Sequence, residues 1–401
     1  MKLNAWTLGL LGAGLVSLPA VTRAEEKPSS VLTALSSTTL SGYVDTSAQW
    51  NMGTGDANTP AYSYSTGKAD GFNLNVVRLV LEKTVESADV WGAGYKVDLW
   101  MGPDANVLAN QSTLATGKSD FAVKQAYAAL HAPLGNGLDF KLGVWDPIMG
   151  YEVSDAPSNP NFTRSYGYTM EPVSHTGLQT TYQFSDAFSA TAGIANTFGP
   201  AINGRAFFGP ANIAAGTQGP QAESYKAYMG AVTLTAPTNW GVLAGSTITG
   251  SIMNGYNSGV STNGADQTSF YVGATLNTPV TGLKVGLCYD YAGVSKQPLT
   301  AQTSSYANAA GLYATYQLTE KMSLNGRAEY ATSGTSAAFG TRKVVETTAT
   351  LQYDLWKNVL SRLEFRWDHS ADGSNAYGGT VVGSPTLKNS YILLADVAYK
   401  F

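Results

Sequence analysis

Between Leu40 and the last residue, the chain repeats stretches of about ten residues in which apolar and polar side chains alternate. A period of two places neighbouring side chains on opposite faces of a β-strand, and about ten residues are enough for a tilted strand to cross a bilayer. We count about sixteen such stretches, or about fourteen if the two weakest belong to loops. They lie near residues 40–50, 72–83, 90–101, 120–131, 137–145, 173–184, 187–197, 223–235, 240–253, 267–278, 281–293, 305–318, 320–332, 342–355, 358–369 and 389–401.

The connections between these stretches alternate between short and long. The short ones are Glu86–Asp89, Pro133–Asn136, Ser185–Asp186, Pro237–Asn239, Pro279–Val280, Thr319–Glu320 and Trp356–Lys357. The long ones are rich in Gly, Asn, Ser and Pro, and they span 51–71, 102–119, 146–172, 198–222, 254–266, 294–304, 333–341 and 370–388. A soluble β-sandwich has no reason to sort its loops in this way. We therefore predict an all-β fold, a transmembrane up-and-down antiparallel β-barrel with short periplasmic turns and long extracellular loops.

The alternation is clearest in 358–369, where apolar residues hold one face and charged residues the other. The stretches 320–332 and 342–355 follow the same pattern. The three neighbouring strands are expected to bring six charged residues together on one wall of the lumen: Arg327, Glu329, Glu346, Arg362, Glu364 and Arg366. Taken alone, they would also fit the solvated face of a soluble sheet, but repetition along the whole chain favours a barrel.

The final stretch places aromatic residues at both ends of one face, with Tyr399 and the terminal Phe401 on the periplasmic side. An amphipathic last strand that ends in an aromatic residue resembles the signal read by the outer-membrane assembly machinery. Asp396 departs from that pattern, because bacterial barrels very often carry Gly there.

The first 24 residues have the features of a secretory signal peptide. Lys2 precedes an apolar run from Ala5 to Val21, and small residues close the run at Ala24, with Ala20 as the alternative cleavage point. The run is interrupted by Gly and Pro and is shorter than the roughly 20 apolar residues of a membrane-spanning helix. We expect 25–38 to form a periplasmic segment, either a tether or a short helix, and 39–401 to form the barrel.

The composition narrows the possible functions further. Only 13% of the residues are charged, against about 25% in soluble domains, and the formal net charge of −4 gives no basic surface for nucleic acid. The single Cys288 allows neither an internal disulfide nor a cysteine metal cluster, and the three histidines lack the spacing of a metal site. Ser174 and His175 point to opposite faces of a regular strand, so they cannot form a nucleophile and base pair. We expect no cofactor, no metal and no enzymatic activity.

Several short sequence motifs follow one another between residues 40 and 200, and their order is more informative than any one of them. They are Trp91-Gly92, Lys96-Val97-Asp98-Leu99, Gly102-Pro103-Asp104, Gln125-Ala126-Tyr127, Gly135-Asn136-Gly137-Leu138-Asp139, Gly150-Tyr151-Glu152, the segment from Asn159 to Tyr166, and His175-Thr176-Gly177. In these motifs the chain resembles the OmpL-like β-barrel porins, also called β-barrel porin type two. The resemblance implies a porin in the outer membrane of a Gram-negative bacterium, and it implies no catalytic residue.

We interpret the chain as a porin through which small hydrophilic solutes and ions diffuse passively. By analogy with general porins, we hypothesise that the third long connection, 146–172, folds into the lumen as a constriction. Its charged residues, which include Glu152, Asp155 and Arg164, would then face the arginines of the wall and create a transverse field. Alternatively, Glu152 and Arg164 pair with each other and fix the loop on the inner wall.

Other functions and partners also fit the sequence. A substrate-specific channel or surface receptor would use the aromatic residues of the loops, namely Tyr62, Tyr64, Tyr166, Tyr168, Phe207 and Phe208. An outer-membrane hydrolase would need a catalytic triad, and none is evident in the sequence. The expected partners are outer-membrane lipid and lipopolysaccharide, the assembly machinery and, by analogy with barrels of this size, two further copies in a homotrimer.

Overall fold

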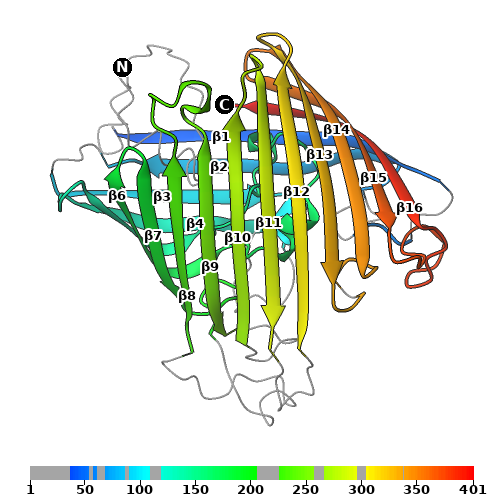
Figure 1. Cartoon of the computed structure of the whole chain (residues 1–401), viewed down its shortest axis with the longest axis horizontal. Helices are drawn as coiled ribbons and strands as arrows, with labels where there is room; N and C mark the ends of the chain where they lie inside the picture. The colour runs from blue at the N-terminus through cyan, green and yellow to red at the C-terminus, as the bar shows by residue number, and fades with distance from the viewer. Residues whose placement is uncertain are drawn as a thin grey trace.

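The computed structural model is a closed barrel of sixteen antiparallel strands (Figure 1). The structure describes residues 37–53, 57–60, 68–85, 90–108, 119–205, 225–256, 266–295, 304–336 and 338–401. The predicted signal peptide and most of the predicted periplasmic segment lie outside these residues. The strands are β1 (Thr38–Met52), β2 (Gly71–Lys83), β3 (Gly92–Met101), β4 (Phe121–Ala132), β5 (Leu138–Trp145), β6 (His175–Ser185), β7 (Phe188–Ala195), β8 (Ala227–Thr235), β9 (Thr247–Tyr256), β10 (Asp266–Asn277), β11 (Leu283–Val294), β12 (Ser305–Gln317), β13 (Met322–Ser333), β14 (Lys343–Trp356), β15 (Val359–Ser370) and β16 (Asn389–Lys400).

Each strand pairs with its neighbours in the sequence, and β1 closes the barrel on β16. In the closing pair, Tyr43 lies opposite Lys400 and Met52 opposite Tyr391. Closure leaves no strand edge unpaired, so the backbone N–H and C=O groups of the sheet are hydrogen-bonded within the barrel, as a membrane-spanning sheet requires. The predicted fold class is confirmed, with the larger of the two strand counts.

The described helices are short. They are α2 (Asp104–Val107), α3 (Tyr166–Met170) and the 3₁₀ turns η2 (Ala156–Ser158) and η3 (Gly241–Leu243). None of them is long and apolar enough to cross a membrane.

One predicted strand starts too early. We expected a strand over 240–253, but β9 begins at Thr247, and the residues before it form a turn that contains η3. Gly241 and Gly245 have positive φ angles of 57° and 79°, which a strand does not accommodate. The Asn277 side chain donates a hydrogen bond of 2.7 Å to the carbonyl of Ala244 and holds the turn against β10.

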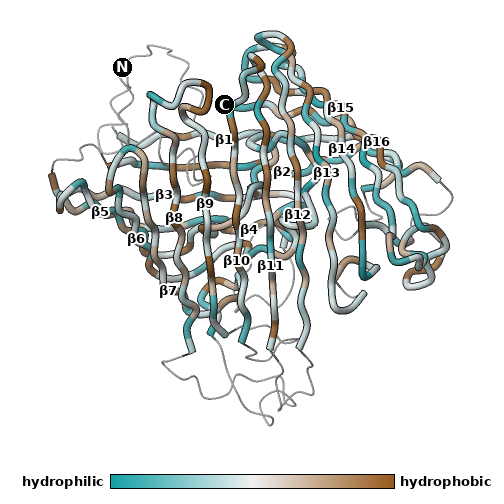
Figure 2. The backbone as a smooth tube through the Cα atoms, viewed as in Figure 1, coloured by the Kyte–Doolittle hydropathy of each residue, from teal (hydrophilic) through white to brown (hydrophobic). Residues whose placement is uncertain are grey.

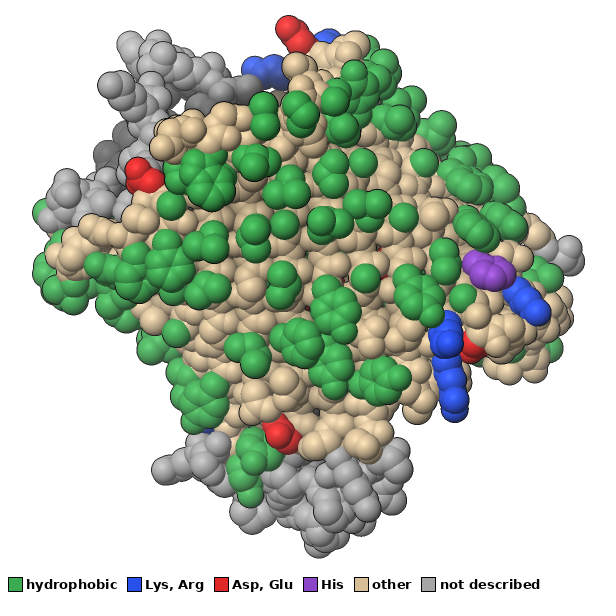
Figure 3. Space-filling view, viewed as in Figure 1, with side chains coloured by type: hydrophobic (Ala, Val, Ile, Leu, Met, Phe, Trp, Pro, Cys, Tyr) green, Lys and Arg blue, Asp and Glu red, His purple; other side chains and the backbone are tan. Residues whose placement is uncertain are grey.

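The two faces of the wall follow the predicted alternation. On β15, the outward-facing Leu363 and Phe365 are 51% and 41% exposed, whereas the inward-facing Arg362 of the same strand is 3% exposed. Figure 2 shows this alternation along the strands, and Figure 3 shows many apolar and few charged side chains on the outer face in view. The outer surface therefore suits hydrocarbon, and the charged side chains lie inside the barrel.

The long connection between β5 and β6, residues 146–174, runs inside the barrel. Its first part packs Ile148 and Met149 against Met229 of β8 and Met253 of β9. Farther along, Phe162 belongs to a second apolar cluster, together with buried residues of β1 to β4 and β16. The connection is thus held by apolar contacts on two sides of the lumen.

The outward parity of β15 leads to a stability prediction. Replacing Leu363 by Arg near the middle of the lipid face should lower the free energy of unfolding by about 2–4 kcal/mol, whereas Ser361→Arg near the rim should lower it by only about 0–1 kcal/mol. Equilibrium unfolding in lipid vesicles would measure both. Equal effects of the two substitutions would contradict the placement of Leu363 in hydrocarbon.

Candidate functional site

The candidate site is the contact between the internal connection, which we call L3 (residues 146–174), and the inner wall. Local hydrogen bonds shape L3 before it meets the wall. The Asn159 side chain accepts from the backbone N–H of Val153 at 2.9 Å and donates to its carbonyl at 2.7 Å. Ser165 caps α3 by accepting from the N–H of Tyr168 at 3.0 Å, the usual role of a serine at that position. L3 is therefore an ordered segment with a defined surface.

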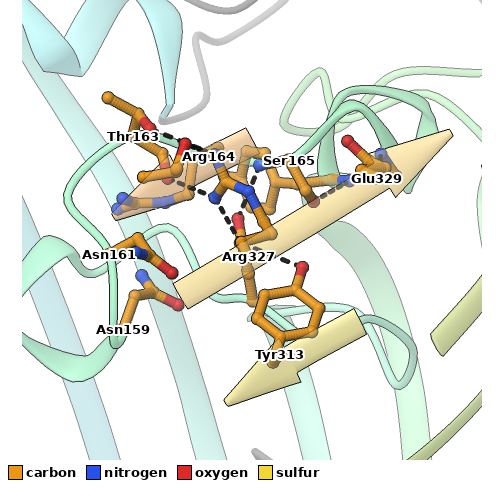
Figure 4. A network of polar contacts seen from close by, with 12 residues as sticks. Asn159, Asn161, Thr163, Arg164, Ser165, Tyr313, Arg327 and Glu329 are labelled. Atoms are coloured by element: carbon orange, nitrogen blue, oxygen red, sulfur yellow. Dashed lines mark hydrogen bonds and ion pairs between the residues drawn. The ribbon is translucent and has the colours of Figure 1, made fainter. Parts of the chain in front are cut away.

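Arg327 of β13 is the main ionic contact between L3 and the wall (Figure 4). Its guanidinium lies 2.7 Å from Glu152 Oε1 of L3 and 3.0 Å from Glu346 Oε2 of β14. The same group donates to the carbonyl of Thr163 at 2.6 Å. All three charged side chains are at most 1% exposed, so Glu152 depends on Arg327 for its charge partner, whereas Glu346 also lies 3.9 Å from Arg366.

Two wall carboxylates accept hydrogen bonds from the backbone of L3. Glu364 accepts from the N–H groups of Phe162 and Thr163 at 2.6 and 2.9 Å. Glu329 accepts from the N–H groups of Tyr166 and Gly167 at 2.5 and 2.7 Å. These bonds satisfy backbone donors that would otherwise be buried without a partner, which is why a loop can run inside the barrel at this place.

Two wall arginines donate to the carbonyls of L3. Arg362 bonds the carbonyl of Ala156 at 3.0 Å and pairs with Asp396 of β16 at 2.9 Å. Arg366 bonds the carbonyl of Arg164 at 2.6 Å. It also pairs with Asp368 at 2.8 Å. The Arg164 guanidinium itself donates to the carbonyls of Val153 and Ser154 at 2.9 and 2.8 Å.

L3 also contacts the part of the inner wall formed by β2 and β3. Asp155 lies 2.8 Å from the guanidinium of Arg78 on β2, which also pairs with Asp98 of β3 at 2.7 Å. Burial disfavours the charged form of Asp155, but the Arg78 guanidinium outweighs it and holds the pKa of that carboxyl below its usual range. Asp155 therefore remains ionised in weak acid and keeps this end of L3 attached.

Where α3 meets β11, acidic groups crowd together. Burial, and after it the neighbouring Asp290, raise the pKa of Glu171 well above its usual range. A Cβ added at Gly167 would come within 2.5 Å of Asp290 Oδ2, so any larger residue would require the Asp290 side chain to move. Among the described residues, no group of three His, Cys, Asp or Glu side chains is arranged to hold a metal ion.

The structure brings all nine predicted pore residues to one contact, but in a different arrangement from the one expected. We expected the arginines to face L3 across open water, and instead Arg327, Arg362 and Arg366 touch L3 directly and are 0–3% exposed. Glu152 pairs with Arg327, not with Arg164 as the alternative proposed. Asp368 and Asp396, which continue the inward face of their strands, also act as partners of the arginines and were not among the predicted residues.

The predicted assembly residues lie at the end of β16 on the outer surface. Tyr399 is 50% exposed and Phe401 46% exposed. The backbone of Phe401 exchanges two hydrogen bonds of 3.0 Å with Gly42 of β1. The last residue is thus part of the strand pairing that closes the barrel.

The double pairing of Arg327 leads to a prediction. Arg327→Met should lower the free energy of unfolding by about 3–5 kcal/mol, because Glu152 would be left buried without a cation and Glu346 would keep only the more distant Arg366. Arg342→Met, at an exposed arginine before β14, serves as the matched control and should have little effect. Denaturation in lipid vesicles would compare them, and a small effect at Arg327 would show that the network does not hold L3.

Comparisons with solved structures identify outer-membrane porins and channels with a similar fold. Similar solved structures include an anion-selective porin from Comamonas acidovorans (TM-score 0.63, 13% identity, 91% of this chain and 99% of that chain covered). A second is the outer-membrane channel DcaP of Acinetobacter baumannii (TM-score 0.57, 14% identity, 91% of this chain and 97% of that chain covered). A third is the trimer form of OmpT of Vibrio cholerae (TM-score 0.52, 15% identity, 91% of this chain and 99% of that chain covered). No curated protein sequence matches the chain.

At these identities, the similar structures establish the fold alone. The sequence profile of the family described as "Putative beta-barrel porin-2, OmpL-like" matches residues 37–401, which include all sixteen strands and the internal loop. The chain belongs to this OmpL-like β-barrel porin family of the outer membrane.

Proposed function

We propose that this protein is a porin through which small hydrophilic solutes and ions diffuse passively, with L3 as the constriction. The observation that supports this function best is L3 itself, an ordered segment bonded to the inner wall of a sixteen-stranded barrel. A barrel of this size encloses a lumen wide enough for water, and a segment folded inside it narrows the passage. No catalytic step is part of this proposal.

Beyond the part of β8 and β9 that Ile148 and Met149 of L3 cover, the composition of the inner wall indicates where the passage runs. From β6 to β10, no inward-facing side chain is an acid, a lysine or an arginine. Hydroxyl groups dominate instead, with Thr181 and Thr191 hydrogen-bonded at 2.9 Å and Thr233 and Thr249 at 3.0 Å. Such a wall offers exchangeable hydrogen bonds to passing solutes without holding ions tightly.

The buried charges then have a structural role in this proposal. Arg327, Glu329, Arg362, Glu364 and Arg366 hold L3 in place, with Glu346 paired to Arg327, and so define the size of the opening. Their charges are neutralised in pairs or by backbone groups, which leaves little net field for solutes. This role replaces the transverse field that we expected from the sequence.

Export, partners and assembly complete the proposal. Residues 1–24 direct export as a signal peptide, and the assembly machinery reads the exposed Tyr399 and Phe401. The apolar side chains on the outer surface of the barrel contact outer-membrane lipid and lipopolysaccharide. A homotrimer is consistent with the trimer form of the similar OmpT of Vibrio cholerae.

Planar-bilayer recording of the refolded full chain tests channel function. A porin gives discrete conductance steps, and their absence would contradict the proposal. Liposome swelling with sugars of graded size then separates a general porin, which sieves by size, from a substrate-specific channel, which saturates. Of the aromatic loop residues that a receptor would use, Tyr166 is buried, and Tyr62, Tyr64, Phe207 and Phe208 lie outside the described residues.

Loosening L3 should change the conductance. The double variant Glu329→Ala and Glu364→Ala removes the acceptors of four L3 backbone N–H groups, so we expect L3 to move and the single-channel conductance to become larger and noisier. Glu320→Ala, in the exposed turn between β12 and β13, is the control and should conduct like the parent protein. Identical traces for both variants would rule out L3 as the constriction.

A further inference from the structure

Lys141 of β5 stands out among the cations of the lumen. The other cations of the inner wall in β2, β4, β13 and β15 each have a carboxylate within 2.7–2.9 Å, and these cations are Arg78, Lys124, Arg327, Arg362 and Arg366. Lys141 forms no ion pair within the part of the chain that the structure describes. Its ammonium group instead lies 5.2 Å from the centre of the Tyr127 ring.

The carboxylates around Lys141 are already engaged with other groups. Glu82 lies 3.6 Å from Lys96, Asp139 lies 2.6 Å from His131, and Asp146 lies 2.7 Å from Lys124. These pairs leave no carboxylate for Lys141, so its ammonium group keeps a free position for a ligand. Leu142, its neighbour in sequence, is 55% exposed on the outer surface, so Lys141 points inward.

A second donor faces the same place. Gln179 of β6 lies directly opposite Lys141 in the strand register, which puts their Cβ atoms about 4.5–5.5 Å apart on the lumen side. The Gln179 side chain is 1% exposed, and its Nε2 has no hydrogen-bond partner. A buried amide without a partner is uncommon in folded proteins and indicates a missing acceptor.

Lys96 adds a third donor from β3. It lies opposite Tyr127 in the register, so its side chain leaves the wall on the lumen side next to the ring that Lys141 approaches. The Lys96 side chain remains 14% exposed although Glu82 is near it. All these residues lie on the short-turn side of L3, where a solute that has passed the constriction would arrive.

We propose that Lys141, Gln179 and Lys96 form a docking position for small anions that carry a carboxylate or phosphate group. Lys141 supplies an unpaired charge, Gln179 an unpartnered N–H donor, and the Tyr127 ring a surface beneath the ammonium group. The site selects anions from the solutes that diffuse through the lumen. This inference rests on the proposed porin function, because only a conducting lumen would expose the site to solutes.

The reversal potential in a KCl gradient tests the proposal. Lys141→Met should lower the chloride to potassium permeability ratio by about fivefold, the effect of one unit charge at about 4 Å in water. Lys141→Arg should retain the ratio of the parent protein. Lys284→Met removes an exposed lysine at the short-turn rim and should change the ratio much less.

Block of the current by inorganic phosphate tests the ligand class and the amide. Phosphate should reduce the current of the parent protein at lower concentration than that of Lys141→Met or of Gln179→Leu. Gln179→Leu leaves the net charge unchanged, so a weaker block there identifies a binding site and not a general field. Heat-dependent gel mobility would show that each variant is folded.

Two results have different meanings. If the parent protein conducts but Lys141→Met and Lys284→Met shift the permeability ratio equally, and phosphate blocks all variants alike, the docking position is refuted and the porin remains. If the parent protein gives no conductance, the porin function itself fails.

Discussion

The structure depends on one constraint: a strand with lipid on one side must place its charged residues in the lumen, and charges there need partners. Along β13 to β16 these charges are so dense that neighbouring strands pair only part of them, as Arg362 does with Asp396. L3 supplies the remainder through backbone groups and through Glu152. The wall orders the loop and the loop neutralises the wall, so neither is stable in this form without the other.

This exchange divides the inner surface into three parts. The wall of β13 to β16 is covered by L3 and is not available to solutes, and the first part of L3 also covers Met229 of β8 and Met253 of β9. The wall of β6 to β10 carries hydroxyl groups and small residues, and β2 to β5 carry half-buried charges such as Glu82 and Lys141. Selection by size therefore falls to L3, and selection by charge falls to a few residues beyond it.

The sequence predicted the strands well, because lipid on one face enforces the alternation that we read. It also predicted which residues share the charged wall, since parity along Arg362, Glu364 and Arg366 is a local property. The predicted start of β9 was wrong. The residues Trp240 to Ser246 were read as part of the strand, but Gly241 and Gly245 adopt turn conformations.

The path of L3 and the contacts that it makes with the wall could not be predicted from the alternation of residues along the sequence. Whether a loop faces a charge across water or touches it depends on the path of L3, which is fixed by contacts with strands nearly 200 residues away, such as that between Asn161 and Thr350. The position of Gln179 opposite Lys141 depends on the register of β5 and β6. A shift of one residue would turn one of the two side chains toward lipid, and no sequence pattern fixes that register alone.

The central claim is that L3 lies on the charged wall inside the barrel, and a cross-link tests it most directly. The side chains of Asn161 and Thr350 are hydrogen-bonded at 2.7 Å and fully buried. In a Cys288→Ser background, the pair Asn161→Cys and Thr350→Cys should form a disulfide under mild oxidation, detected by mass spectrometry. The pair Asn161→Cys and Ala349→Cys, whose second site faces outward, should not. Free thiols at 161 and 350 that both react with a water-soluble maleimide would contradict the account.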